Sequence, residues 1–348
     1  MRRIRLRLQL RTMLQKYKTS LILVLLMNIA IVRRIVSLSS SASLSSRSFS
    51  TSTSALNMKK TTKSKTIDSH LHVWATEAES TTYPYASIDQ TPPPSLIDSS
   101  STTSLLTQMK EHGVDGALIV QPINHQYDHR YVSNAIETYP DKFKGMMLFD
   151  PSIVNGDEAV SRLEELVLKG FVGVRFNPYL FEGDSAMRMS DHEGAIAVLK
   201  RCGELKLPVG IMCFKGIDLH YDDIVTLCNI SPTTPILLDH FGFASVNDNH
   251  DNTQFDMVCQ LGQTHDNVHV KISAMFRVAG QHGSYPFDNV KKQRFDKLLE
   301  VYGPNRLMFG TDFPFITEQT DGYKGGVDVV RSWVEDKDEN VRDAIMGG

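Results

Sequence analysis

Eight short runs of apolar and β-branched residues recur along this chain, and they constrain its fold more than any other feature. The runs lie at residues 66–74, 116–122, 143–149, 171–176, 208–214, 235–241, 268–274 and 307–312. Each has the length of a buried strand, and most are bounded by glycine, proline or aspartate. Residues 117–120 and 236–238 are apolar on both faces, which favours a parallel sheet covered on both sides.

The segments between these runs carry helical patterns. Apolar residues from Leu105 to Met109 fall at helical spacing before Gly113, and further helices are predicted at 157–170, 191–205, 218–230 and 287–302. Eight strand–helix units in about 280 residues predict a single-domain α/β fold, a (β/α)8 TIM-like barrel. An open doubly wound sheet is the alternative, although no GxGxxG follows a strand. Residues 75–104 are predicted to form a long loop on the active face of the barrel.

The charge distribution separates an N-terminal segment from the rest. Residues 1–67 hold 14 Lys and Arg and no acid, whereas the remaining 281 residues hold 23 Lys and Arg against 40 Asp and Glu. This acidity excludes a general nucleic-acid-binding surface. No run of about 18 apolar residues occurs, so no stable membrane span is expected in the body, residues 67–348.

The first 66 residues are predicted to be a targeting presequence that is removed or disordered. They are rich in arginine and serine and lack acids, which is typical of a mitochondrial transit peptide. The apolar run 21–32 is also compatible with a secretory signal peptide or a short membrane anchor, and a plastid targeting peptide would have the same composition. Initiation at Met58 would give a cytosolic form.

Polar residues fall at the ends of the predicted strands, where barrels carry their chemistry. His70 and His72 are two positions apart in the first run and share a face, roughly 7 Å apart. Both imidazoles could therefore bind one cation, with buried histidines of the core as the alternative. His240 and Asp312 follow the sixth and eighth runs and are candidate catalytic residues, because a carboxylate there could bind a metal or accept a proton.

A second set of polar residues is predicted to contact substrate. Arg175 and Asn177 share a face at the end of the fourth run, and a guanidinium is suited to bind a substrate carboxylate. An internal ion pair is the alternative for Arg175. The full set of substrate-binding candidates is Arg175, Asn177, Gln121, Lys271, Arg277 and Tyr285.

Five motifs together resemble the amidohydrolase superfamily, in particular its amidohydrolase-related (family 2) branch. They are IDSHLHVW, GVRFNP, LLDHFG, VKIS and LMFGTDFP, and they extend from Ile67 to Pro314. The resemblance implies a distorted (β/α)8 barrel, with His70 and His72 as the first-strand pair, His240 as the sixth-strand histidine and Asp312 as the eighth-strand aspartate. The most similar branch contains lactone hydrolases of the pyrone-dicarboxylate and sugar-lactone types, and a related branch contains metal-dependent decarboxylases.

The sequence departs from the family pattern at the fifth run, residues 208–214, which contains no histidine. The resemblance therefore implies one divalent metal, zinc or manganese, held by His70, His72 and Asp312, or no metal at all. We hypothesise a hydrolase that opens a lactone or similar ester of a small carboxylated metabolite by activated-water attack. A non-oxidative decarboxylase of an unsaturated or aromatic acid and a non-catalytic binding barrel are the alternatives. The expected partner is a small-molecule substrate, and a homo-oligomer is compatible with the sequence.

Overall fold

A computed structural model describes residues 64–181, 187–247, 249–281 and 283–347, and residues Thr62–Gly348 form one compact unit. Apart from its last three positions, the predicted presequence lies outside the described residues. Among the helices that are described, none is long and apolar enough to cross a membrane.

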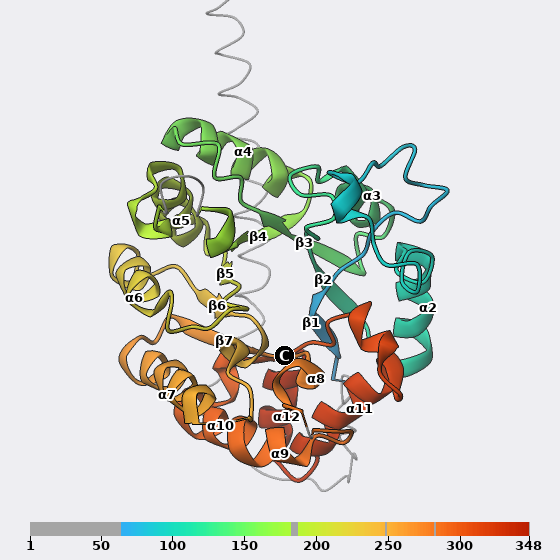
Figure 1. Cartoon of the computed structure of the whole chain (residues 1–348), viewed down its shortest axis with the longest axis vertical. Helices are drawn as coiled ribbons and strands as arrows, with labels where there is room; N and C mark the ends of the chain where they lie inside the picture. Colours follow the sequence, from blue (N-terminus) through green and yellow to red (C-terminus); the bar gives the residue numbers. More distant parts are fainter. Residues whose placement is uncertain (1–63, 182–186, 248, 282, 348) are drawn as a thin grey trace, which may run out of the picture. The chain divides into compact units, whose positions relative to one another are not determined.

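Eight parallel strands form one sheet whose spatial order follows the chain (Figure 1). The strands are β1 (Ile67–Leu71), β2 (Gly116–Val120), β3 (Phe143–Leu148), β4 (Phe171–Phe176), β5 (Val209–Ile211), β6 (Ile236–Leu238), β7 (Val268–Ile272) and β8 (Leu307–Phe309). Every predicted run contains one of them. The barrel prediction is confirmed, because order β1 to β8 with all neighbours parallel is that of eight successive βα units.

The ring closes between β1 and the chain just beyond β8. The backbone N–H of Asp312 donates to the carbonyl of His70 at 2.9 Å, and the N–H of His72 donates to the carbonyl of Phe313 at 2.7 Å. Leu71 and Phe313 form a parallel bridge at the same place. These bonds exclude the open doubly wound sheet, and they bring the first and last sequence motifs together.

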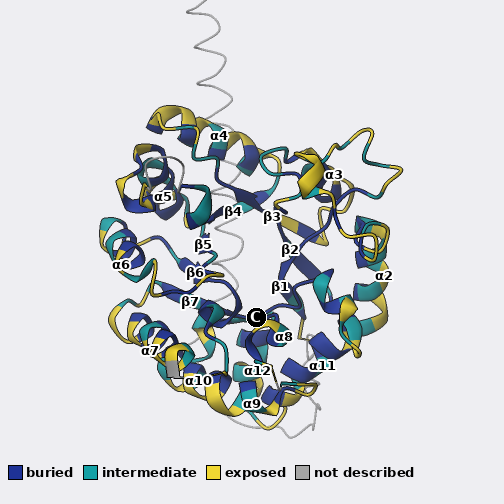
Figure 2. Ribbon diagram, in the orientation of Figure 1, coloured by how far each residue is buried: buried dark blue, intermediate teal, exposed yellow. Residues whose placement is uncertain are grey.

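Helices surround the strands and turn their apolar faces inward (Figures 1 and 2). They are α2 (Thr102–His112), α3 (Arg130–Thr138), α4 (Gly156–Leu168), α5 (Glu193–Leu205), α6 (Tyr221–Ile230), α7 (Asn249–Thr264), α8 (Met275–Val278), α9 (Asp288–Val290), α10 (Asp296–Tyr302), α11 (Gly322–Val334) and α12 (Glu339–Met346). The main core lies between strands and helices. A second cluster of Val120, Met146 and Leu237 packs among the strands themselves, as the inward positions of a barrel do.

The element boundaries differ from the predicted ones mainly at strand ends. β5, β6 and β8 have three residues each, and the polar residues placed at the ends of the sixth and eighth runs lie in the turns beyond them. The backbone leaves the extended conformation there, with positive φ at His240 and at Asp312. The helix predicted at 287–302 is divided into α9, a π-helical turn (Lys291–Phe295) and α10. The predicted loop 75–104 ends where α2 begins at Thr102.

A buried histidine, His129, links a loop to the barrel through two hydrogen bonds. Nε2 of His129 accepts the backbone N–H of Leu148 at 3.1 Å, while its Nδ1–H donates to the carbonyl of Tyr127 at 2.8 Å. Burial lowers the pKa of His129 to about 4. Only the neutral imidazole can make both bonds, since protonation would turn the accepting nitrogen into a donor that faces an N–H.

We therefore expect His129 to make the fold sensitive to acid. Because its pKa is lower in the folded chain than in the unfolded chain, its stabilisation is complete above about pH 6.5 and is lost as the pH falls toward 4, by about 3 kcal/mol in total. Urea unfolding of the native chain and of His129→Gln at pH 7.5 and 4.5 measures this. The variant should lose less stability on acidification, and equal losses in the two proteins would contradict the prediction.

Candidate active site

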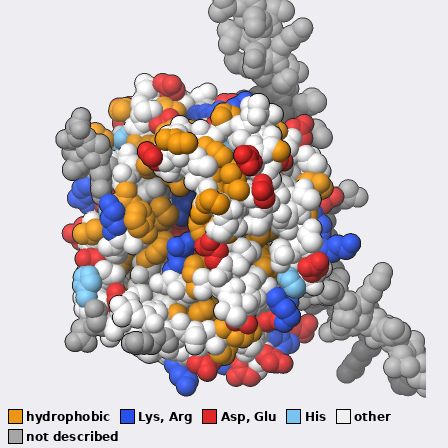
Figure 3. Space-filling view, turned by 45° about the vertical axis from the view of Figure 1, so that its right-hand side comes forward, with side chains coloured by type: hydrophobic (Ala, Val, Ile, Leu, Met, Phe, Trp, Pro, Cys, Tyr) orange, Lys and Arg blue, Asp and Glu red, His pale blue; other side chains and the backbone are white. Residues whose placement is uncertain are grey.

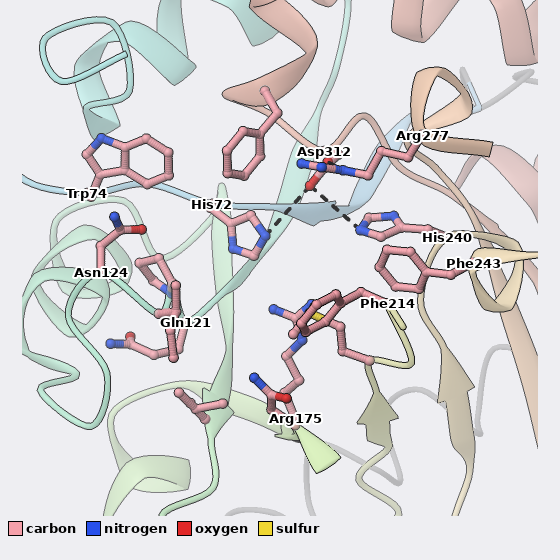
Figure 4. A pocket seen from close by; sticks show the side chains of 16 residues that line it. His72, Trp74, Gln121, Asn124, Arg175, Phe214, His240, Phe243, Arg277 and Asp312 are labelled. Carbon is pink, nitrogen blue, oxygen red and sulfur yellow. Dashed lines mark hydrogen bonds and ion pairs between the residues drawn. The ribbon is translucent and has the colours of Figure 1, made fainter. Parts of the chain in front are cut away.

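Three histidines converge on one carboxylate oxygen at the C-terminal ends of the strands. The Nε2 atoms of His70, His72 and His240 lie 4.0, 3.7 and 3.8 Å from Oδ1 of Asp312. Figure 4 shows His72 and His240 on opposite sides of Asp312. His70 of β1, His72 just beyond that strand, and the residues that follow β6 and β8 thus meet at one point, as the motif positions predict.

Left-handed turns bring two of these side chains into the site. Asp312 has φ +64, and the four consecutive residues from His240 to Phe243 all have φ between +49 and +68. Non-glycine residues rarely adopt this conformation, and such positions cluster at functional sites. At Gly242 the available space excludes a side chain, because a Cβ atom would lie 2.6 Å from Cγ2 of Val258. The glycine of the LLDHFG motif therefore has a steric role in placing His240.

The histidines are neutral and oriented by their second ring nitrogens. Nδ1–H of His72 donates to the carbonyl of Val120 at 2.8 Å, so its Nε2 carries a lone pair facing Asp312. Nδ1 of His240 is hydrogen-bonded to Oγ of Ser273 at 2.8 Å. Burial lowers the pKa of all three imidazoles, that of His70 to about 3. The neutral imidazole is also the form that binds a metal ion.

The carboxyl group of Asp312 has an unusually high pKa for an aspartate. Burial raises its pKa to about 6, against the opposing effect of Arg277, whose Nε donates to Oδ2 at 2.8 Å. The carboxylate is therefore ionised at neutral pH, yet it is a stronger base than an exposed aspartate. A carboxylate of this kind can accept a proton from water.

The residues at this point fit a divalent cation. His70, His72 and Asp312 are buried and each offers one ligand atom, and these atoms lie within 4.8 Å of one another. Nε2 of His70 is buried and has no hydrogen-bond partner among the described residues. Two imidazole nitrogens and a carboxylate form a donor set of the kind that zinc uses in catalytic sites.

A cavity of about 230 Å³ opens above the histidines. Aromatic side chains form much of its wall, namely Trp74, Phe214, Phe243 and Phe315. Arg175 and Arg277 are the cations that line it. In the space-filling view, hydrophobic side chains border a hollow in which blue cationic groups are visible (Figure 3). The cavity therefore combines flat apolar walls with positive charge beside a possible metal site, which suits a small anionic ligand that contains a ring.

The sequence matches the model of the family described as Amidohydrolase over residues 67–348. The chain belongs to the amidohydrolase family. This match confirms the resemblance seen in the five motifs. As a member of this family the protein is a hydrolase. Among curated proteins, none matches the sequence.

Several solved structures share the fold of this amidohydrolase. One is described as a probable 2-pyrone-4,6-dicarboxylic acid hydrolase from Acinetobacter baumannii with citric acid bound (TM-score 0.65, 20% identity, covering 81% of this chain and 96% of that one). An amidohydrolase from Burkholderia multivorans with bound zinc has a TM-score of 0.63 at 18% identity, covering 82% and 96%. A 2,6-dihydroxybenzoate decarboxylase from Rhizobium has a TM-score of 0.52 at 15% identity, covering 81% and 96%. At these identities the likeness shows the fold alone.

Four of the six predicted substrate-binding residues of the amidohydrolase line the cavity. They are Arg175, Asn177, Gln121 and Arg277. Gln121 turns its amide toward the following loop, where Nε2 donates to the carbonyls of Gln126 and Asp128 at 3.0 Å each. The position of Arg175 fits both predictions, a substrate contact and an internal ion pair, because it lines the cavity and also forms a buried ion pair with Asp239.

The other two predicted residues do not line the cavity. Lys271 is fully buried, and its Nζ lies 3.1 Å from Nδ1 of His70 and 3.3 Å from Oδ1 of Asp239. Period-two alternation shows which face of a strand a residue occupies, but not how deep in the barrel its side chain ends. Tyr285 is 42% exposed and lines a separate, smaller pocket beside Phe287. It lies in a loop, where no periodicity indicates direction.

Sequence reasoning also missed functional positions. The aromatic wall comes largely from loops, and apart from Trp74 in IDSHLHVW its members lie outside the five motifs. Asn124 lines the cavity from the loop after β2, and its Nδ2 donates to the carbonyl of Gln90 at 2.7 Å, which leaves its Oδ1 as an acceptor. Asp239 was visible next to His240 in LLDHFG, but its part in the site depends on contacts with β1, β4 and β7.

Proposed function

We propose that this amidohydrolase opens a lactone, or a similar ester, of a small carboxylated molecule by attack of an activated water. The observation that supports the proposal best is the position of Asp312, a buried carboxylate among three neutral histidines at the base of a cavity lined by two arginines. The arrangement supplies a base for water and a charge partner for the substrate within one small space.

The charged and aromatic groups of the cavity favour a flat anionic substrate. Nε and Nη2 of Arg175 are held by Asp239 at 3.1 and 3.0 Å, so the guanidinium is fixed in orientation before a substrate carboxylate arrives. Trp74 and Phe315 could pack against a ring. The printed description of one similar structure, a pyrone dicarboxylic acid hydrolase, agrees with this substrate class.

In the mechanism that we propose, Asp312 moves the proton. A divalent cation held by His70, His72 and Asp312 would polarise the substrate carbonyl and make water more acidic. Asp312 accepts a proton as water attacks the carbonyl carbon, and it returns that proton to the ring oxygen when the C–O bond breaks. Ser273 can donate to Nδ1 of His240, which then presents Nε2–H to the oxygen on which negative charge develops.

A substrate panel separates this proposal from its rivals. Acid release would be followed with a pH indicator for lactones that carry a carboxylate, for matched lactones without one, and with Asp312→Asn as background. Carboxylated lactones should be hydrolysed with the lower KM. CO₂ release from hydroxybenzoates without lactone hydrolysis would instead indicate a decarboxylase. The metal content of the purified body, measured in parallel, tests the cation.

Arg277 should set the pH at which activity falls in acid. Its positive charge lowers the pKa of Asp312, so Arg277→Met should raise that pKa and shift the acid limb of kcat/KM to higher pH. The measurement is kcat/KM between pH 4.5 and 8. Lys292→Met, which removes an exposed cation that does not line the cavity, is the control and should leave the limb in place. An unshifted limb in Arg277→Met would argue against Asp312 as the base.

We propose, from the sequence alone, that residues 1–66 direct the protein to mitochondria. The support is their basic, acid-free and serine-rich composition. A fluorescent protein fused behind residues 1–66 should accumulate in mitochondria. Accumulation in plastids, in the secretory route or in the cytosol would refute this address in favour of one of the alternatives.

A further inference from the structure

Four charged or polar side chains form a buried cluster beneath the cavity, which we call the Asp239 cluster. Its members are His70, Arg175, Asp239 and Lys271. Oδ2 of Asp239 pairs with Arg175, while its Oδ1 lies 3.1 Å from Nδ1 of His70 and 3.3 Å from Nζ of Lys271. Asp239 and Lys271 are 1% and 0% exposed, and neither lines the cavity. Of the four members Arg175 alone lines the cavity, so Asp239 and Lys271 act on the reaction through their neighbours.

The two neighbours of Nδ1 of His70 favour opposite tautomers. The carboxylate of Asp239 can only accept, so it requires a proton on Nδ1, whereas an ammonium at Lys271 can only donate, so it would require a lone pair there. Nζ of Lys271 lies 3.1 Å from Nδ1 of His70, close enough for a hydrogen bond. The arrangement of donors and acceptors around the ring therefore decides which nitrogen carries the proton.

That arrangement favours a proton on Nδ1. In this tautomer the proton on Nδ1 of His70 lies beside Oδ1 of Asp239, 3.1 Å away, an acceptor that no other hydrogen bond among the described residues occupies. In the other tautomer a buried Nε2–H would have no acceptor nearer than Oδ1 of Asp312 at 4.0 Å. A buried N–H without an acceptor is rare in proteins and destabilising.

We propose that Asp239 is a positioning residue that keeps the proton of His70 on Nδ1 and so leaves the Nε2 lone pair free to bind a divalent cation. The inference rests on the metal site of the proposed function and adds the residue that prepares it. Carboxylates commonly orient metal-binding histidines in this way. Here the same carboxylate also holds Arg175, so one buried group positions both a metal ligand and the proposed substrate anchor.

Zinc affinity tests the proposal without any substrate. The dissociation constant for Zn²⁺ would be measured by competition with a chromophoric chelator for the native protein, Asp239→Asn and Lys271→Met. Asp239→Asn should bind Zn²⁺ about 10–100-fold more weakly. Lys271→Met removes the other buried charge of the pair together with the competing donor, so it should bind no more weakly than the native protein. Equal affinity of folded Asp239→Asn and native protein, or equal weakening in both variants, would overturn the proposal.

The tautomer itself can be observed in the native, metal-free protein, so the test survives if Asp239→Asn does not fold. Nitrogen NMR of ¹⁵N-histidine-labelled protein distinguishes protonated from unprotonated ring nitrogens, and His70→Gln identifies the signals of His70. A proton on Nδ1 with a free Nε2 is expected, and a proton on Nε2 would overturn the proposal. The Zn²⁺ dissociation constant and the NMR spectrum do not depend on turnover. Failure of the lactone assay would therefore refute the proposed substrate, whereas the role of Asp239 would still be decided by these two measurements.

Discussion

Asp312→Asn should lower kcat by about 10²–10⁴-fold, the usual contribution of a general base, while the protein stays folded. Asparagine has nearly the same shape but cannot accept a proton. Burial already favours the uncharged form of Asp312, as its raised pKa of about 6 shows, so a neutral amide should be tolerated there. Steady-state kinetics on a hydrolysed lactone measures the effect, with the melting temperature as evidence of folding.

The matched control is Asp266→Asn, which makes the same change on an exposed residue and should leave kcat unaltered. A folded Asp312→Asn protein with native turnover would contradict the role of Asp312 as the base. Reduced Zn²⁺ binding in that variant together with lost activity would fit its second proposed role as a ligand.

Asp68→Ala should destabilise the fold by about 4 kcal/mol, because it leaves several buried donors without an acceptor. The carboxylate of Asp68 is fully buried and accepts the backbone N–H groups of His70 and Thr311 at 3.2 and 3.0 Å. It also accepts the hydroxyl of Thr311 and that of Tyr323, the latter at 3.2 Å. The bonds to Thr311 and Tyr323 join β1 to the chain after β8 and so hold the barrel closed beside the active site.

Urea unfolding of Asp68→Ala and Tyr323→Phe measures the strength of this connection. Tyr323→Phe removes one hydrogen bond to the same carboxylate, so it should cost only about 1 kcal/mol. If Asp68→Ala were no more destabilising than Tyr323→Phe, Asp68 would not be the group that closes the barrel. Zinc binding should weaken along with stability in Asp68→Ala, since His70 and Asp312 flank the bonds that are lost.

The metal-site candidates could be predicted because they depend on local patterns. The period-two relation of His70 to His72, and the position of Asp312 just after a buried run, are both visible in a few residues of sequence. Once eight strands are arranged in a ring, residues 242 positions apart in the sequence come into contact at its seam, as the hydrogen bond between Asp312 and His70 shows. Conversely, the direction of the Tyr285 side chain could not be predicted, because a loop has no periodicity.

The sequence by itself determined the order of strands and helices and the strand ends that carry the histidines, because the period of the apolar residues is a local property of each segment. It left an open sheet as the alternative, and the hydrogen bonds between β1 and the chain after β8 decided for the closed barrel. Only the tertiary structure decided that Lys271 is buried behind His70, that Asp239 connects a metal ligand to Arg175, and that aromatic loops enclose the cavity. These outcomes depend on the depth of a side chain in the barrel and on loops from different strands meeting in space, and neither is recorded in the spacing of residues along the chain.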